Sequence, residues 1–256
     1  MTAILRTILL TNARDRMLPA VWALALAALL ASRALGGAML VEGRETALAY
    51  ASLSLRLVVV AGLVMCVCFQ MRRLQETREI EAMLARPLSR TALVLALAGG
   101  YGLLAAAAVL PSVAVLGLAL NPDAAGLVLW GASLLLEAWI TVAFALFLAC
   151  SLTSAAASAL TALALYALSR MAAGFHDIAQ AGLGDALASP VTGLPLRLAA
   201  EAMSLVLPRL DLFGQSSWLV YGAGGEWGLG ILAAQAGIYL PLLLAATVYD
   251  LKGRQF

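Results

Sequence analysis

Six long runs of apolar residues, separated by shorter polar segments, dominate the pattern of the chain. Each run is about as long as the ~20 apolar residues that an α-helix needs to cross the hydrocarbon core of a bilayer. The runs are rich in Leu and Ala and lack the alternation of the ~10-residue strands of a membrane barrel. The pattern therefore predicts an all-α integral membrane protein whose single transmembrane domain, 1–256, has spans at about 18–40, 50–71, 91–120, 124–152, 154–174 and 227–249.

Composition supports this prediction and suggests an orientation. Hydrophobic residues make up 63% of the chain and charged residues 12%, and the mean hydropathy is +0.97. A soluble domain has about 25% charged residues, because its surface must be wetted. With both termini in the cytoplasm, ten of the 16 Lys and Arg residues lie on the inner side and six on the outer side. The positive-inside rule then predicts a multi-pass protein of the cytoplasmic membrane.

Three segments outside the spans have patterns of their own. Residues 4–16 have apolar positions at helical spacing, which predicts a helix lying in the membrane interface; a frayed cytoplasmic tail is the alternative. Residues 175–226 form a long outer loop, with an amphipathic candidate helix at 194–207, and offer a surface for an extracytoplasmic partner. The third segment, 70–90, lies between the second and third spans and is rich in charge.

The segment 70–90 carries most of the information about mechanism. Acidic residues alternate with arginines, and apolar residues recur at helical spacing. Pro87 would end such a helix and Ser89 would cap the next one. The segment is either a solvated loop or a short helix that docks on a cytoplasmic partner. The docking helix would present Glu76, Glu79, Ile80, Glu81, Met83, Leu84, Arg86, Pro87, Ser89 and Arg90.

Three short motifs resemble those of the ABC-2-type transporter permeases. The stretch 86–95, Arg-Pro-Leu-Ser-Arg-Thr-Ala-Leu-Val-Leu, is similar to the turn after the second span in that family. Pro208, Asp211 and Phe213 resemble its Pro-x-x-Asp-x-Phe element before the last span. The tail 249–256 resembles its basic C-terminus that ends in an aromatic residue. With the six spans and the amphipathic N-terminal segment, the resemblance covers the whole chain.

The resemblance implies the permease subunit of an ABC exporter. Two copies of the chain would form a homodimer, and segment 76–86 of each would act as a coupling helix in a cleft of a separate ATPase subunit. ATP and Mg²⁺ would bind to two copies of that ATPase. This chain has no Gly-x-x-x-x-Gly-Lys-Ser/Thr sequence, so we expect it to bind no cofactor itself. Closure of the ATPases would open a path between the two permease copies.

Charged residues within the spans are further candidates. Glu137 lies near the middle of the fourth span, where a charge costs about 2.5–3.5 kcal/mol on insertion scales. Ser133 and Thr141 flank it at helical spacing, and with Trp130 the four residues could line a substrate cavity. The alternative is a protonated Glu137 that bonds a neighbouring helix, and we expect Glu137→Gln to leave assembly intact. Arg56, near the outer end of the second span, is expected to snorkel to the interface.

Three classes of function are consistent with the sequence. A permease for an amphipathic or lipid-like substrate is favoured, because the spans are mostly Leu, Ala and Val. A scaffold or mechanotransmission subunit driven by an ATPase would instead dock its partner on 175–226. An intramembrane enzyme using Glu137 or His176 and Asp177 is least favoured, because no residues have metal-ligand spacing or a nucleophile motif. We expect no catalytic residue, metal site or nucleic-acid partner, and Cys66, Cys68 and Cys150 to be free and buried.

Overall fold

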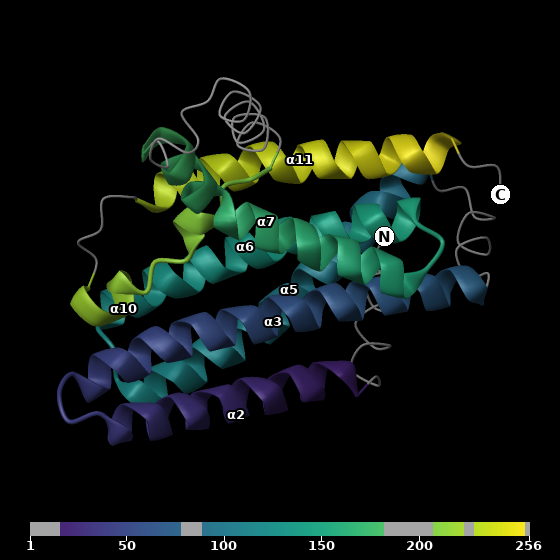
Figure 1. Cartoon of the computed structure of the whole chain (residues 1–256). Coiled ribbons are helices and arrows are strands. Elements are labelled where there is room, and N and C mark those ends of the chain that lie inside the picture. The colour runs from purple at the N-terminus through teal and green to yellow at the C-terminus, as the bar shows by residue number, and fades with distance from the viewer. Residues whose placement is uncertain (1–15, 78–88, 182–206, 223–227, 254–256) are drawn as a thin grey trace.

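The computed structural model describes residues 16–77, 89–181, 207–222 and 228–253, and within α7 it leaves the side chains of 173 and 175–181 undescribed. The described chain is helical and contains no strand. Two short elements, the 3-10 helix η1 (Leu210–Phe213) and α10 (Ser217–Tyr221), precede the last long helix. Six helices are long and apolar enough to cross a membrane (Figure 1): α2 (Met17–Ala38), α3 (Gly43–Glu76), α5 (Arg90–Leu120), α6 (Ala124–Ser151), α7 (Ala155–Ala181) and α11 (Leu229–Gly253).

The prediction of an all-α membrane protein with six spans is confirmed at this level. The third and fourth spans match α5 and α6 to within one residue at each end. The helix that contains the second span extends beyond the predicted range of 50–71, because α3 begins at Gly43 and ends at Glu76. The additional residues include Arg44, Glu45 and Arg72, which lower the hydropathy but do not interrupt a helix. Hydropathy therefore located the part of α3 that suits hydrocarbon and missed its polar ends.

Several helix ends are fixed by capping residues that the sequence supplies. The Ser89 hydroxyl accepts a hydrogen bond from the Ala92 amide at 3.2 Å, which confirms the predicted cap of α5. The Asp123 carboxylate accepts one from the Gly126 amide at 2.9 Å and starts α6. The connection between α5 and α6 has only three residues, 121–123, and its last residue is the cap Asp123. Short connections of this kind make consecutive spans antiparallel neighbours.

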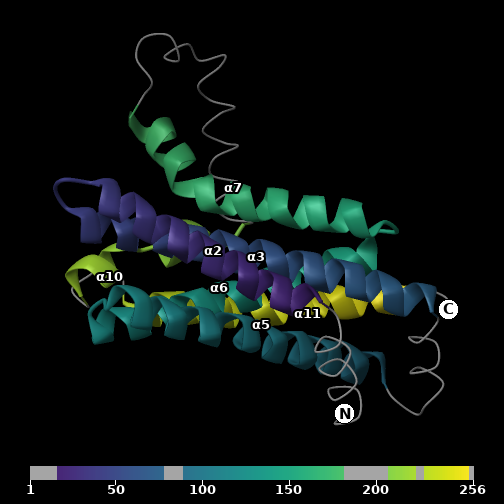
Figure 2. The same ribbon diagram turned by 90° about the horizontal axis from the view of Figure 1, so that it is seen from below.

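Helix α6 lies at the centre of the bundle. It packs against α3, α5, α7, α11, η1 and α10, whereas α2 packs on α3 and α5 at one edge. Figure 2 shows α7 on the opposite side of the bundle from α5. The first residue of α2 and the last residue of α11 lie at the same end of the bundle, as six crossings require, and α10 lies at the other end (Figure 1).

The outer surface of the helices is apolar. Large apolar side chains on all six long helices face outwards, with Leu30 61% exposed, Leu110 61%, Leu160 68% and Ile238 65%. A soluble monomer does not expose this much continuous apolar surface. Together with the six long apolar helices, this surface identifies a multi-pass membrane protein.

Three predicted helices cannot be compared with the structure. The interfacial helix at 4–16 lies outside the described residues except for its last residue, and so does the outer helix at 194–207 except for its last residue. The predicted docking segment is described only up to Thr77 and again from Ser89. These helices therefore stay predictions.

Candidate functional site

A buried cluster of charged side chains joins three of the spanning helices. Arg56 of α3 donates through Nη1 to Glu137 Oε2 of α6. Arg170 of α7 donates through Nη1 to Glu137 Oε1 at 3.3 Å, and the Tyr166 hydroxyl donates to the same oxygen at 2.9 Å. The side chains of Glu137 and Arg56 are 0% and 1% exposed, and that of Arg170 is 18% exposed. We call these four residues the Glu137 cluster.

The helices bring these residues to the same depth. Arg56 is the thirteenth residue after Gly43, the first residue of α3, and Glu137 is the thirteenth after Ala124, the first of α6. Both helices begin at the same end of the bundle, so each charge lies about 20 Å along its helix at 1.5 Å per residue. Tyr166 and Arg170 are four residues apart, on one face of α7.

Pairing makes this burial possible. An unpaired charge taken out of water costs several kcal/mol, and a partner with good geometry offsets that cost. Glu137 receives donors on both carboxylate oxygens. Two guanidinium groups nevertheless share one carboxylate, so the ion pairs leave the cluster one positive charge in excess.

The expectation that Arg56 snorkels to the interface was wrong. Its guanidinium stays within the bundle, where Nη2 donates to Ser133 Oγ at 3.1 Å and the central carbon lies 5.2 Å from the centroid of the Trp130 ring. Glu137 lies at the same depth and pairs with the Arg56 guanidinium, so Arg56 does not need to extend to water. Glu137 does bond neighbouring helices, as in the alternative of a protonated Glu137, but here it accepts from two arginines and forms ion pairs with them.

The short 3-10 helix η1, which precedes α11 in the chain, packs against the cluster. Phe213, at the end of η1, is 0% exposed, and its carbonyl oxygen lies 3.2 Å from Ser133 Oγ. Arg170 Nη1 donates to the carbonyl oxygen of Leu210 at 3.1 Å. Irregular backbone at membrane depth needs such partners, because lipid offers none. Ser133 and Arg170 therefore hold the ion cluster and η1 together.

The structure thus joins two sets of residues that the sequence presented separately. The stripe Trp130, Ser133, Glu137 and Thr141 is buried throughout, and Thr141 Oγ1 bonds carbonyls of its own helix. None of the four lines either of the two cavities described below. The motif residues Pro208, Asp211 and Phe213 lie in or beside η1, where Asp211 pairs with Arg209 at 3.0 Å.

One cavity opens next to the cluster. Its volume is about 410 Å³, and its lining contains both Arg56 and Arg170. Gly214 and Ser216, which follow η1, form another part of the wall. The rest of the lining comes from the first turns of α3: Ala49, Tyr50, Ser52 and Leu53. Sequence reasoning did not anticipate this cavity, because the two arginines are 114 residues apart in the chain and Arg56 had been expected to reach the membrane interface.

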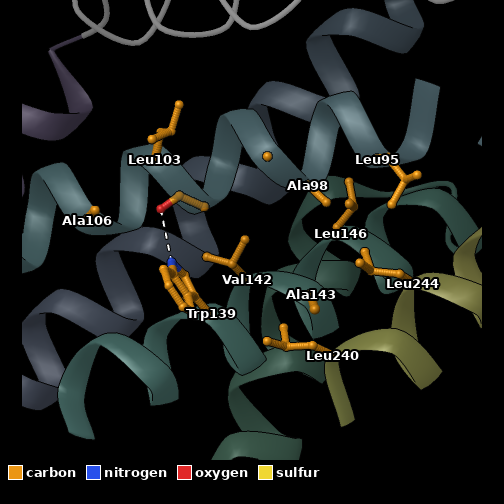
Figure 3. A pocket seen from close by; sticks show the side chains of 12 residues that line it. Leu95, Ala98, Leu103, Ala106, Trp139, Val142, Ala143, Leu146, Leu240 and Leu244 are labelled. Atoms are coloured by element: carbon orange, nitrogen blue, oxygen red, sulfur yellow. Dashed lines mark hydrogen bonds between the residues drawn. The ribbon is translucent and has the colours of Figure 1, made fainter. Parts of the chain in front are cut away.

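A second cavity, of about 400 Å³, is apolar and lies away from the charges. It is bounded by α5, α6 and α11, with Leu95, Leu146 and Leu244 among its lining residues (Figure 3). The indole Nε1 of Trp139 is turned to the carbonyl oxygen of Gly102, at 3.1 Å (Figure 3). The lining offers no charged group, so this cavity suits an acyl chain or another apolar surface.

The residues at the other end of α3 are only partly described. Glu76 pairs with Arg72 at 2.9 Å on the exposed surface of α3. Arg90 donates through Nη1 to the carbonyl oxygens of Leu251 and Lys252, at 2.7 and 3.0 Å, and so caps the end of α11. The remaining predicted docking residues lie outside the described residues: Glu79, Ile80, Glu81, Met83, Leu84, Arg86 and Pro87.

The described cysteines and other side chains of metal-ligand type form no candidate metal centre. Cys66, Cys68 and Cys150 are buried thiols, as expected. Within the described part of the chain, no three His, Cys, Asp or Glu residues are placed to hold a metal ion. The side chains of His176 and Asp177 are not described.

Comparison with family models and with curated proteins adds no relative. No family model matches the chain. No curated protein matches it either. Any assignment of function therefore depends on the residues and their geometry.

Proposed function

We propose that this chain is the permease subunit of an ABC exporter of the ABC-2 type, driven by an ATPase on a separate polypeptide. Two copies would form the transmembrane part, and two ATPase subunits would bind ATP and Mg²⁺. The chain itself would not be catalytic. The proposal is supported by the three sequence motifs, by the six spanning helices and by the way that α3 leaves the membrane.

The observation that carries the proposal is the length and position of α3. Its 34 residues extend for about 51 Å at 1.5 Å per residue, more than the ~40–45 Å of a whole bilayer with its headgroups. Its last turns carry Arg72, Arg73 and Glu76, and Gln75 Nε2 donates to the carbonyl oxygen of Ala149 near the end of α6 at 3.1 Å. The predicted docking segment thus follows a helix that is tied to the central helix of the bundle.

The Glu137 cluster suggests how movement at that end would reach the interior. Arg56 lies 20 residues before Glu76 on the same continuous helix, a distance of about 30 Å. A displacement of α3 by the ATPase would act on Glu137 and, through Arg170, on α7 and η1. In the proposed mechanism these elements move together because the Glu137 cluster links them.

The proposed substrate is amphipathic or lipid-like. The outward faces of the helices and the 400 Å³ cavity are apolar, and a path between two copies would be built mainly from such surfaces. Membrane lipids are the natural neighbours of these faces. An external partner on the loop 175–226 belongs to the alternative of a mechanotransmission subunit, which no observation on the described residues favours.

Charge reversal in the docking segment tests the proposal. The variant Glu79→Lys/Glu81→Lys should release the ATPase, because both acids lie in the segment that would enter its cleft. The matched control is Glu42→Lys/Glu45→Lys, at the opposite end of α3. Each variant is solubilised through a C-terminal tag, and the P-loop protein that elutes with it is quantified by mass spectrometry. Loss with the first variant and retention with the control support the proposal, whereas equal retention contradicts it.

A further inference from the structure

The cavity beside the Glu137 cluster has the charge of an anion site. Arg56 and Arg170 both contribute to its wall, and none of the described residues in its lining is an Asp or Glu. Glu137, the carboxylate that both arginines contact, does not line the cavity. One positive charge therefore remains uncompensated by these pairs at the cavity wall, where the surroundings are largely apolar and a charge is poorly screened.

Arg170 has hydrogen-bond donors that no described residue uses and that could bind a ligand. Its two bonds to described residues, to Glu137 and Leu210, both use Nη1. Among the described residues, no hydrogen bond involves its Nη2 or Nε. The guanidinium is planar and presents its donors as a fork that matches a carboxylate or phosphate. An anion in the cavity could therefore be bound by Arg170 without breaking the pair with Glu137.

Gly214 keeps this guanidinium accessible. A Cβ atom at position 214 would lie 2.6 Å from both Nη atoms of Arg170, so any larger residue would push the guanidinium aside. The backbone at Gly214 has φ −82°, which every residue can adopt, so space rather than conformation accounts for glycine here. The absence of a side chain leaves Arg170 against the cavity that Gly214 also lines.

The remaining walls are amphipathic. Tyr50, Ser52 and Ser216 contribute hydroxyl groups, and Ala49 and Leu53 contribute apolar surface. Tyr50 is 53% exposed and lies about 10 Å along α3 from Gly43, so the cavity runs from the end of the bundle towards its middle. A volume of about 410 Å³ accommodates a phosphate group with part of an attached organic body.

We propose that this cavity binds a phosphate oxyanion through Arg170 and Arg56, either as the headgroup of an anionic phospholipid or as free phosphate. Binding neutralises the excess positive charge and engages the spare donors of Arg170 in charge-assisted hydrogen bonds. The site does not depend on the permease assignment, since it follows from the cluster and the cavity alone.

The test uses the full chain, purified and delipidated in a neutral detergent. Three probes are added at constant ionic strength: phosphatidylglycerol, phosphatidylcholine with the same acyl chains, and inorganic phosphate. Binding is followed by native mass spectrometry and by the shift of the thermal unfolding midpoint. We expect one phosphatidylglycerol or one phosphate per chain, and no comparable binding of phosphatidylcholine, whose headgroup carries a compensating positive charge.

Two variants locate the binding site. Arg170→Gln should weaken binding of the anionic probe about tenfold or more, as expected for a lost charge-assisted hydrogen bond. Leu53→Trp fills the cavity without touching the charges and should also abolish binding. Its control is Leu57→Trp, one turn further along α3 on a residue of similar exposure, 46% against 51%, that does not line the cavity.

Each outcome decides the proposal. A lipid headgroup site is established if phosphatidylglycerol binds, Leu53→Trp removes this binding and Leu57→Trp retains it. The same pattern with inorganic phosphate establishes a site for a free anion. Binding of neither probe overturns the proposal. Equal binding of both lipids, or binding unaffected by Leu53→Trp, overturns it as well. The Leu53→Trp comparison remains decisive if Arg170→Gln does not fold.

Discussion

Replacing Glu137 with Gln should destabilise the helix bundle, which revises the expectation from sequence that assembly would stay intact. The substitution leaves the Arg56 guanidinium, 1% exposed, facing a neutral amide, and it removes the partner of Arg170. Removing one member of a buried ion pair costs about 3–5 kcal/mol. Gln keeps one oxygen acceptor. We therefore expect the free energy of unfolding to fall by about 3 kcal/mol, the lower end of that range.

The cluster predicts that a second substitution will restore part of this loss. Arg56→Gln alone leaves Glu137 paired with Arg170 and bonded to Tyr166, so its cost should be smaller, about 1.5–3 kcal/mol. The double variant Arg56→Gln/Glu137→Gln removes both fully buried charges and leaves only Arg170, which is 18% exposed. Its unfolding free energy should therefore exceed that of Glu137→Gln alone.

The assay is a denaturant titration in mixed micelles, followed by tryptophan fluorescence, on the original chain, the two single variants and the double variant. The decrease in unfolding free energy of the double variant should be smaller than the sum of the two single decreases by about 2 kcal/mol or more. A difference of this size is within the range found for directly interacting residues. If the two losses simply add, the Arg56–Glu137 pair does not couple energetically. The proposed coupling of α3 to α6 through this ion pair would then be refuted.

Two further predictions concern single hydrogen bonds. Ser133→Ala removes a hydroxyl that contacts a carbonyl of η1 and should cost about 1–3 kcal/mol in the same titration, whereas Ser112→Ala, whose hydroxyl bonds only its own helix, should cost less. Arg90→Gln frees the last carbonyls of α11 and should speed hydrogen exchange in its final turn, while Arg72→Gln, which breaks only an exposed pair, should leave that exchange unchanged.

The sequence allowed the spanning helices to be predicted because lipid leaves a strong compositional signal. A helix that faces hydrocarbon must be apolar for about 20 residues, and six such runs appear. Ser89 also marked the start of α5 correctly, since capping is a local interaction. The polar ends of α3 were missed because helix continuity does not depend on hydropathy.

The candidate site could be predicted only in part. Glu137 was recognisable, because a carboxylate in the middle of an apolar run is costly and therefore conspicuous. Its partners come from α3 and α7, and no pattern along the chain shows which helices are neighbours. The matching depths of Arg56 and Glu137 appear only in the structure, because they are counted from Gly43, whereas the predicted second span begins at residue 50.

The contacts of η1 could not be predicted from the sequence either. Pro208, Asp211 and Phe213 were selected by resemblance to a family motif, without a physical reason for their position. In the structure the chain after Pro208 packs against α6 and α7, and its carbonyls bond Ser133 and Arg170. That arrangement depends on contacts across about 40 to 80 residues, which sequence patterns cannot specify.

The central claim is that this chain works as a dimeric permease with a separate ATPase, and native mass spectrometry of the complex tests it most directly. The unmodified chain is extracted gently from its native membrane through a C-terminal tag, and the mass of the intact assembly is measured. The account predicts two copies of this chain with two copies of a P-loop ATPase. A chain that emerges alone, or with partners that lack any nucleotide site, would contradict it.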